Sequence, residues 1–126
     1  MKLSLTRAAA VPAVLSCLAL GALGASSPAS ATPASAAKTC SAPANYPGSG
    51  YFTSLKVSGV GCSTGRAVTL AHYRCRVKHG RAGKCGTKVL HYSCSEKRNG
   101  IATEFDSRVT CRRGSRSVVY TYQQNL

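Results

Sequence analysis

Two copies of a His-Tyr-x-Cys pattern, His72 to Cys75 and His91 to Cys94, are the residues of this 126-residue chain with the clearest potential for chemistry. Two histidines and two cysteines can hold a tetrahedral zinc ion. In an extended strand, however, residues 91 and 94 lie on opposite faces. Cysteines of an exported chain also form disulfides rather than zinc thiolates. We therefore expect no metal and no other cofactor, and we interpret the repeated pattern as a coincidence.

A small basic protein could also be a nuclease, which needs a general base, a general acid and a cation for the phosphate. Glu104, either His72 or His91, and one of several arginines could take these roles. The other acids are Glu96 and Asp106, and the spacing of the three selects none of them for catalysis. All three can equally be surface partners of nearby arginines. We predict no catalytic residue and keep a secreted nuclease as an alternative.

The first 31 residues have the organisation of a secretory signal peptide. Lys2 and Arg7 are followed by an apolar run over 8–25 and by an Ala-Ser-Ala cleavage motif at 29–31. A second such triplet at 34–36 makes cleavage after residue 36 the alternative. The run is short for a transmembrane helix, and no later segment is as apolar. We expect a secreted, extracellular protein with no transmembrane segment after processing.

Cleavage after residue 31 removes one of the seven cysteines and leaves an even number, which in a short exported chain indicates three disulfides. Fifteen pairings of six cysteines are possible. The arrangement of strands expected below favours one set, in which the partners are Cys62–Cys94, Cys40–Cys111 and Cys75–Cys85.

The strongest compositional signal is charge, since 17 lysines and arginines stand against three acids, for a net charge of +14. This balance excludes an acid-rich active site and a carboxylate cage for calcium. We expect an anion-binding surface for nucleic acid, cell-wall polymer or a membrane surface. A solvated surface that only keeps the protein soluble is the alternative. The expected surface consists of Arg74, Arg76, Lys78, Arg81, Arg112, Arg113 and Arg116.

The residues of the expected basic surface must be positioned by a folded domain, which we place over 51–126. A flexible lead-in rich in Ala, Ser, Pro and Gly precedes it at 32–50, and Cys40 ties this lead-in to the domain. Alternating residues predict strands over 51–60, 88–96, 104–112 and 117–123. Two dipeptides, Asn99-Gly100 and Arg113-Gly114, predict the turns between the last three strands.

Between the first two strands, Ser63 or Thr64 can cap a helix that ends at His79-Gly80. The expected apolar face of this helix consists of Ala67, Val68, Leu70, Ala71, Cys75 and Val77. The order strand, helix, strand, strand, strand predicts an α+β fold, namely a small disulfide-stapled domain with one helix packed on a mostly antiparallel sheet of about four strands.

With these motifs placed, the chain resembles a group of small, uncharacterised, secreted, disulfide-containing proteins of high-GC Gram-positive bacteria. The resemblance spans about residues 40–122 and is carried by residues 57–62 (VSGVGC), 90–94 (LHYSC), 108–114 (RVTCRRG) and 118–120 (VVY). It implies no activity. Cys75 and Cys85 look like an addition to the four cysteines usual in the group.

The expected function is therefore that of a monomeric, non-catalytic binding module for anionic partners. Two alternatives remain, namely a small basic nuclease and an exported antimicrobial or inhibitor-type effector.

Overall fold

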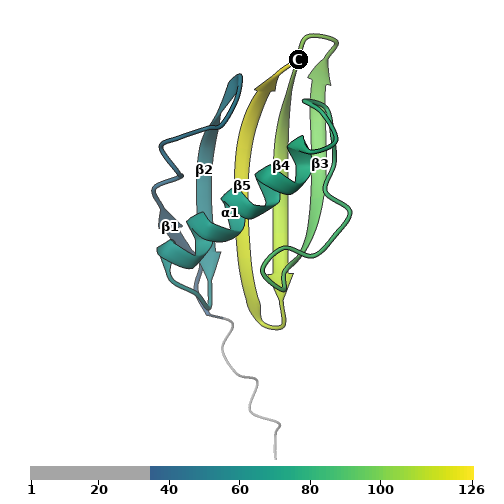
Figure 1. Ribbon diagram of the computed structural model, residues 1–126. Helices are drawn as coiled ribbons and strands as arrows, with labels where there is room; N and C mark the ends of the chain where they lie inside the picture. The colour runs from purple at the N-terminus through teal and green to yellow at the C-terminus, as the bar shows by residue number, and fades with distance from the viewer. Residues whose placement is uncertain (1–34) are drawn as a thin grey trace, which may run out of the picture. The chain divides into compact units, whose positions relative to one another are not determined.

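Alternating apolar and polar residues in the C-terminal third of the chain produce a continuous antiparallel meander of three long strands (Figure 1). The computed structural model describes residues 35–126. The strands are β3 (Ser93–Ile101), β4 (Glu104–Arg113) and β5 (Arg116–Asn125). Every second residue of β4 and β5 is buried over most of their length. This alternation gives the sheet one covered face and one open face.

Two further strands, β1 (Lys38–Cys40) and β2 (Gly50–Ser58), complete a five-stranded sheet in the order β1-β2-β5-β4-β3. All neighbouring strands are antiparallel. The sheet thus has five strands rather than the expected four, because β1 pairs with β2 inside the segment expected to be a flexible lead-in.

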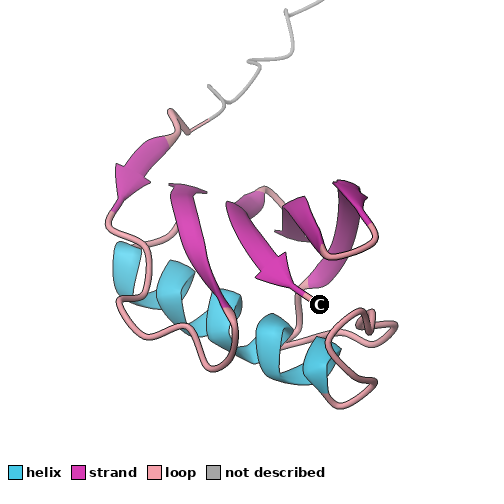
Figure 2. Ribbon diagram, turned by 90° about the horizontal axis from the view of Figure 1, so that it is seen from above, coloured by secondary structure: helices cyan, strands magenta, loops and turns pink. Residues whose placement is uncertain are grey.

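The one helix of residues 35–126, α1 (Cys62–Val77), crosses one face of the sheet and gives the fold its second layer (Figures 1 and 2). It begins after Gly61, without a side-chain cap, so the predicted cap at Ser63 or Thr64 is wrong. A Cβ atom on Gly65 would lie 2.5 Å from Val57, so glycine allows the helix to approach β2 closely. The buried helix positions are spaced by three and four residues; they are Gly65, Val68, Thr69, His72, Tyr73 and Arg76.

Strand β3 begins five residues later than expected. Leu90 and His91 have positive φ values of 47° and 67°, so the backbone is not extended just before the strand begins. Asn99-Gly100 is not a turn, since both residues pair with β4 and the turn falls at residues 102–103. The predicted turn at Arg113-Gly114 is confirmed, with φ of 57° at Gly114.

Residues 35–126 contain three disulfides, and one of them, Cys75–Cys85, confirms a predicted pair. The other two predicted pairs, Cys62–Cys94 and Cys40–Cys111, are wrong. Cys40 bonds Cys62, and Cys94 bonds Cys111. The error follows from the strands, because Cys94 and Cys111 are direct cross-strand partners in the observed register.

The expected signal peptide, residues 1–31, lies outside the described residues. So does the first residue of the alternative cleavage motif at 34–36. Over residues 35–126, no helix combines the length and apolarity needed to cross a membrane.

Candidate functional site

The predicted anion-binding surface does not form one continuous patch. Arg112, Arg113 and Arg116 are exposed around the β4–β5 turn, whereas Arg74, Lys78 and Arg81 are exposed at the end of α1 and in the loop after it; these three form a separate helix-end cluster. The seventh residue, Arg76, is fully buried and contacts Gln124 on β5. Gln124 is eight residues from Arg116 along β5, roughly 26 Å at the rise of a strand. The two exposed groups therefore lie near opposite ends of the sheet.

Arg76 is buried among aromatic rings and hydrogen-bond acceptors of the domain, so its side chain is not available to bind a partner. Its guanidinium lies 4.8 Å from the ring centroids of both Tyr73 and Tyr122. It donates hydrogen bonds to Gln124 Oε1 at 2.6 Å and to the main-chain carbonyl of Arg81 at 2.5 Å. Its charge is therefore used inside the domain, where it joins α1, β5 and the following loop. Including Arg76 in the anion-binding surface was wrong.

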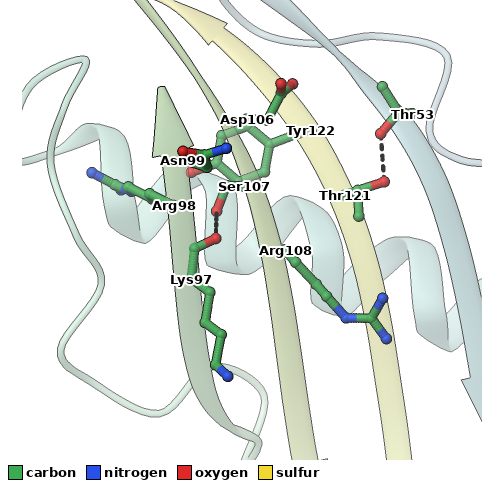
Figure 3. A pocket seen from close by; sticks show the side chains of 9 residues that line it. All are labelled: Thr53, Lys97, Arg98, Asn99, Asp106, Ser107, Arg108, Thr121 and Tyr122. Atoms are coloured by element: carbon green, nitrogen blue, oxygen red, sulfur yellow. Dashed lines mark hydrogen bonds between the residues drawn. The ribbon is translucent and has the colours of Figure 1, made fainter. Parts of the chain in front are cut away.

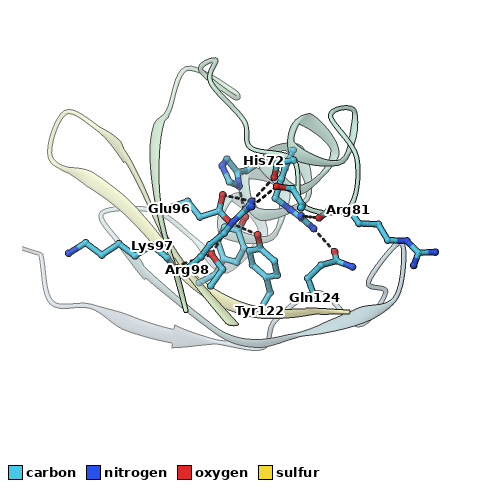
Figure 4. A network of polar contacts seen from close by, with 12 residues as sticks. His72, Arg81, Glu96, Lys97, Arg98, Tyr122 and Gln124 are labelled. Atoms are coloured by element: carbon cyan, nitrogen blue, oxygen red, sulfur yellow. Dashed lines mark hydrogen bonds and ion pairs between the residues drawn. The ribbon is translucent and has the colours of Figure 1, made fainter. Parts of the chain in front are cut away.

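A second buried group is centred on Glu96 of β3 (Figure 4). The Glu96 carboxylate accepts hydrogen bonds from Arg98 Nε at 2.9 Å, from the Ser107 hydroxyl at 2.8 Å and from the Tyr122 hydroxyl. Burial opposes its ionised form, but these donors outweigh burial and hold the pKa of Glu96 below its ordinary value. Glu96 is thus an internal ion-pair partner and not the surface residue that we expected.

Arg98 extends this network into the loop that follows the helix. Its guanidinium donates to the main-chain carbonyls of Ala82 and Gly83 and lies 4.4 Å from the Phe105 ring centroid. Burial disfavours its charge, but the Glu96 carboxylate raises the pKa of Arg98 above its ordinary value. The network holds the loop after α1 against strands β3 and β4.

The groups considered for a nuclease are not brought together. His72 is buried, its Nδ1 lies 2.6 Å from the Tyr120 hydroxyl, and burial lowers its pKa. His91 is exposed just before β3, near the strand end where Ser93 pairs with Arg112. Glu104 is eight residues from Arg112 along β4, roughly 26 Å away, and accepts a hydrogen bond from Gln123.

The repeated His-Tyr-x-Cys pattern likewise makes no site. Cys75 and Cys94 belong to two different disulfides, and each bonds another cysteine rather than standing free as a thiolate. Among the described residues, no group of three or more His, Cys, Asp or Glu side chains is arranged to hold a metal ion.

The open face of the sheet carries the remaining polar groups in rows set by the strand register. One row runs from Lys97 through Arg108 and Thr121 to Ser54. The row on one side contains Asn99, Asp106 and Gln123, and the row on the other contains Ser95, Thr110, Val119 and Lys56. Lys97 and Arg108 are direct cross-strand partners, so their Cα atoms lie about 5 Å apart.

A pocket of about 400 Å³ lies on this face (Figure 3). A bulge in β2, at Thr53, brings two hydroxyl side chains of that strand against Thr121. Ser54 Oγ lies 2.6 Å from Thr121 Oγ1, and Thr53 also hydrogen-bonds to Thr121. The residues that line the pocket, which we call the open-face pocket, are Thr53, Lys97, Arg98, Asn99, Asp106, Ser107, Arg108, Thr121 and Tyr122.

Of the cations in this pocket, Lys97 and Arg108 are exposed. Their side chains extend away from the carboxylate of Asp106 (Figure 3). Across residues 35–126, the only ion pair is Arg98–Glu96, so neither Lys97 nor Arg108 has an acidic partner in the fold. Sequence reasoning missed this pair, because only the register of β3 against β4 makes the two residues neighbours.

Comparison with protein-family models, with curated protein sequences and with solved structures finds no match to this chain.

Proposed function

We propose that this chain is an exported, monomeric, non-catalytic module that binds an anionic polymer through its exposed basic surface. Export rests on the signal-peptide pattern of residues 1–31 and is consistent with the three disulfides, which persist in oxidising compartments. The disulfides and the buried network of Glu96 and Arg98 stabilise the domain, and the exposed lysines and arginines take no part in either.

One observation carries the proposal, namely that the exposed cations lack acidic partners. Residues 35–126 contain 15 lysines and arginines and three acids, which gives a net charge of +12. Twelve of these 15 cations are exposed, and the one ion pair within this part of the chain takes up Glu96. A surface with this excess attracts polyanions by charge and releases their counterions on binding.

The test is a salt series with the purified, disulfide-bonded protein, against a single-stranded oligonucleotide and an anionic cell-wall polymer, with analysis of the polymers afterwards. We expect binding at low salt, a linear decrease of log K with log salt, and intact polymer. Absence of binding to both polymers at low salt would overturn the proposal. Cleavage of the oligonucleotide would replace it with the nuclease alternative.

A further inference from the structure

We infer that the open-face pocket is a subsite for a polyol-phosphate chain, in which Lys97 and Arg108 bind a phosphate and the neighbouring Asp106 and Asn99 bind hydroxyl groups. This inference rests on the proposed function, because it assigns a ligand class and a site to the same polymer-binding surface.

The first step of the argument is the pair of like charges. Lys97 and Arg108 are directly opposed on neighbouring strands, an arrangement that disfavours the pairing unless an anion lies between the charges. Asp106 is two residues from Arg108 on the same face, yet it forms an ion pair with neither cation in the described fold. A phosphate bound between the two side chains would relieve the repulsion, and its oxygens match the donors of lysine and arginine.

The second step is the composition of the row beside this pair. Asn99 and Asp106 are cross-strand partners and both are exposed. A carboxylate repels a phosphate but accepts a hydrogen bond from a hydroxyl group, and an amide can both donate and accept. A site with two cations in one row and an acid and an amide in the next therefore suits a ligand that alternates phosphates with hydroxyl-bearing carbons.

The third step concerns the hydroxyl groups on the β2 side. The bulge places Thr53 and Ser54 together against Thr121, and the hydroxyl residues Thr53 and Thr121 line the pocket. Hydroxyl groups both donate and accept, which suits a flexible polyol.

The same face is poorly suited to nucleic acid. Single strands are bound by stacking their bases on exposed aromatic rings. The pocket has one aromatic residue in its lining, Tyr122, and its ring is buried on the side of the Arg76 guanidinium. Tyr51, an exposed aromatic residue of the sheet, does not line the pocket.

The experiment measures the binding of the full, disulfide-bonded protein to three probes of matched charge, which are a glycerol-phosphate oligomer, inorganic polyphosphate and oligo-dT. The double variant Lys97→Gln/Arg108→Gln is compared with Arg113→Gln/Arg116→Gln, which removes the same charge from the β4–β5 turn. We expect the pocket variant to lose about tenfold or more in affinity for the glycerol-phosphate oligomer, and the turn variant to lose clearly less.

A second comparison asks whether the loss of a carboxylate tightens or weakens the binding of each probe. Removing any carboxylate should tighten the binding of a polyanion by charge alone. We expect Asp106→Ala to weaken binding of the glycerol-phosphate oligomer by about tenfold, through loss of a hydrogen bond to a charged group, while it tightens binding of polyphosphate. The matched variant Glu104→Ala, on the same open face, should weaken neither.

The outcomes separate the two proposals. Three results would overturn the polyol-phosphate site and leave charge-driven binding intact. They are equal losses of affinity for the glycerol-phosphate oligomer in the two double variants, tighter binding of all three probes by Asp106→Ala, and a preference of the wild type for oligo-dT. Failure of the wild-type protein to bind any probe at low salt would overturn the proposed function itself. Far-UV circular dichroism and thermal midpoints, compared with those of the wild type, verify that each variant is folded.

Discussion

The Glu96 carboxylate provides a direct test of what holds the loop after α1 against the sheet. Its side chain is 7% exposed and that of its partner Arg98 is 17% exposed, so most of the water around this ion pair has been removed. Glu96→Gln keeps the shape and one acceptor oxygen but leaves the Arg98 cation without a counter-charge. Breaking a buried ion pair by removing one partner is worth about 3–5 kcal/mol. Because Arg98 retains some solvent contact, we expect about 3 kcal/mol, at the lower end of this range.

Urea unfolding at neutral pH, followed by circular dichroism, measures this loss as a difference in the free energy of unfolding. Glu104→Gln is the matched control. Glu104 is exposed and hydrogen-bonds to Gln123 at the sheet surface, so its variant should stay within about 0.5 kcal/mol of the wild type. If Glu96→Gln and Glu104→Gln have the same small effect, the argument for the buried network is refuted.

The pH dependence adds an independent check on Glu96. The folded protein holds its pKa below the ordinary value of 4.5, so between these two values the unfolded chain binds more protons than the folded one. The stabilisation from the carboxylate is complete above pH 4.5 and is lost as the pH falls through the folded pKa. The stability difference between the wild type and Glu96→Gln should therefore narrow below pH 4.5 and disappear in stronger acid.

Three further results are expected. Burial lowers the pKa of His72 below 6.5, so the unfolded chain binds the extra proton and stability should fall as the pH drops below 6.5; in His72→Gln the slope over this pH range should be smaller, and an unchanged slope would contradict the assignment. Replacing Cys75 and Cys85 together by serine opens a loop with a sequence separation of 10 and should lower the free energy of unfolding by about 3 kcal/mol, measured in urea. Lys97→Glu places an acid opposite Arg108 and should raise stability by about 0.2–1 kcal/mol while it weakens polyanion binding; a loss of stability would contradict the repulsion between the two cations.

The sequence predicts the architecture where the signals are local. Residues 104–112 and 117–123 alternate strongly, and the structure has strands at Glu104–Arg113 and Arg116–Asn125. The Arg113-Gly114 turn and the Cys75–Cys85 bridge are also local, with few residues between the interacting groups. For these features the chain needs no information from distant residues.

The elements that sequence reasoning missed depend on distant partners. Residues 38–40 have no strand pattern of their own and become β1 only because they pair with residues 55–57 of β2. The helix was expected to bury its apolar residues, yet Thr69, His72 and Arg76 face inward. Each of these three side chains makes a specific hydrogen bond, and the partners of His72 and Arg76 lie on β5, although the buried Arg76 Nε has no partner.

The candidate site depends on register, which is the part of a sheet that local patterns define least. A shift of one residue moves a side chain to the other face. The Asn99-Gly100 dipeptide is a strong turn signal in isolation, but a Cβ atom on Gly100 would lie 2.5 Å from Phe105, and here glycine serves a close cross-strand approach. A turn at 99–100 would end the strand too early for Lys97 to pair with Arg108, as it does in the observed register.

A high net charge is enough to favour solubility, but it does not explain the placement of Lys97 and Arg108. A solubilising surface gains nothing from two cations on directly opposed strand positions, since any spacing gives the same net charge and a wider one avoids the repulsion. An acid at either position would form a cross-strand pair that stabilises the sheet. The protein instead uses one of its three acids, Glu96, inside the domain and leaves this pair beside a pocket on the open face. The arrangement is unfavourable for the isolated fold and favourable for holding an anion, which is the relation expected of a binding site.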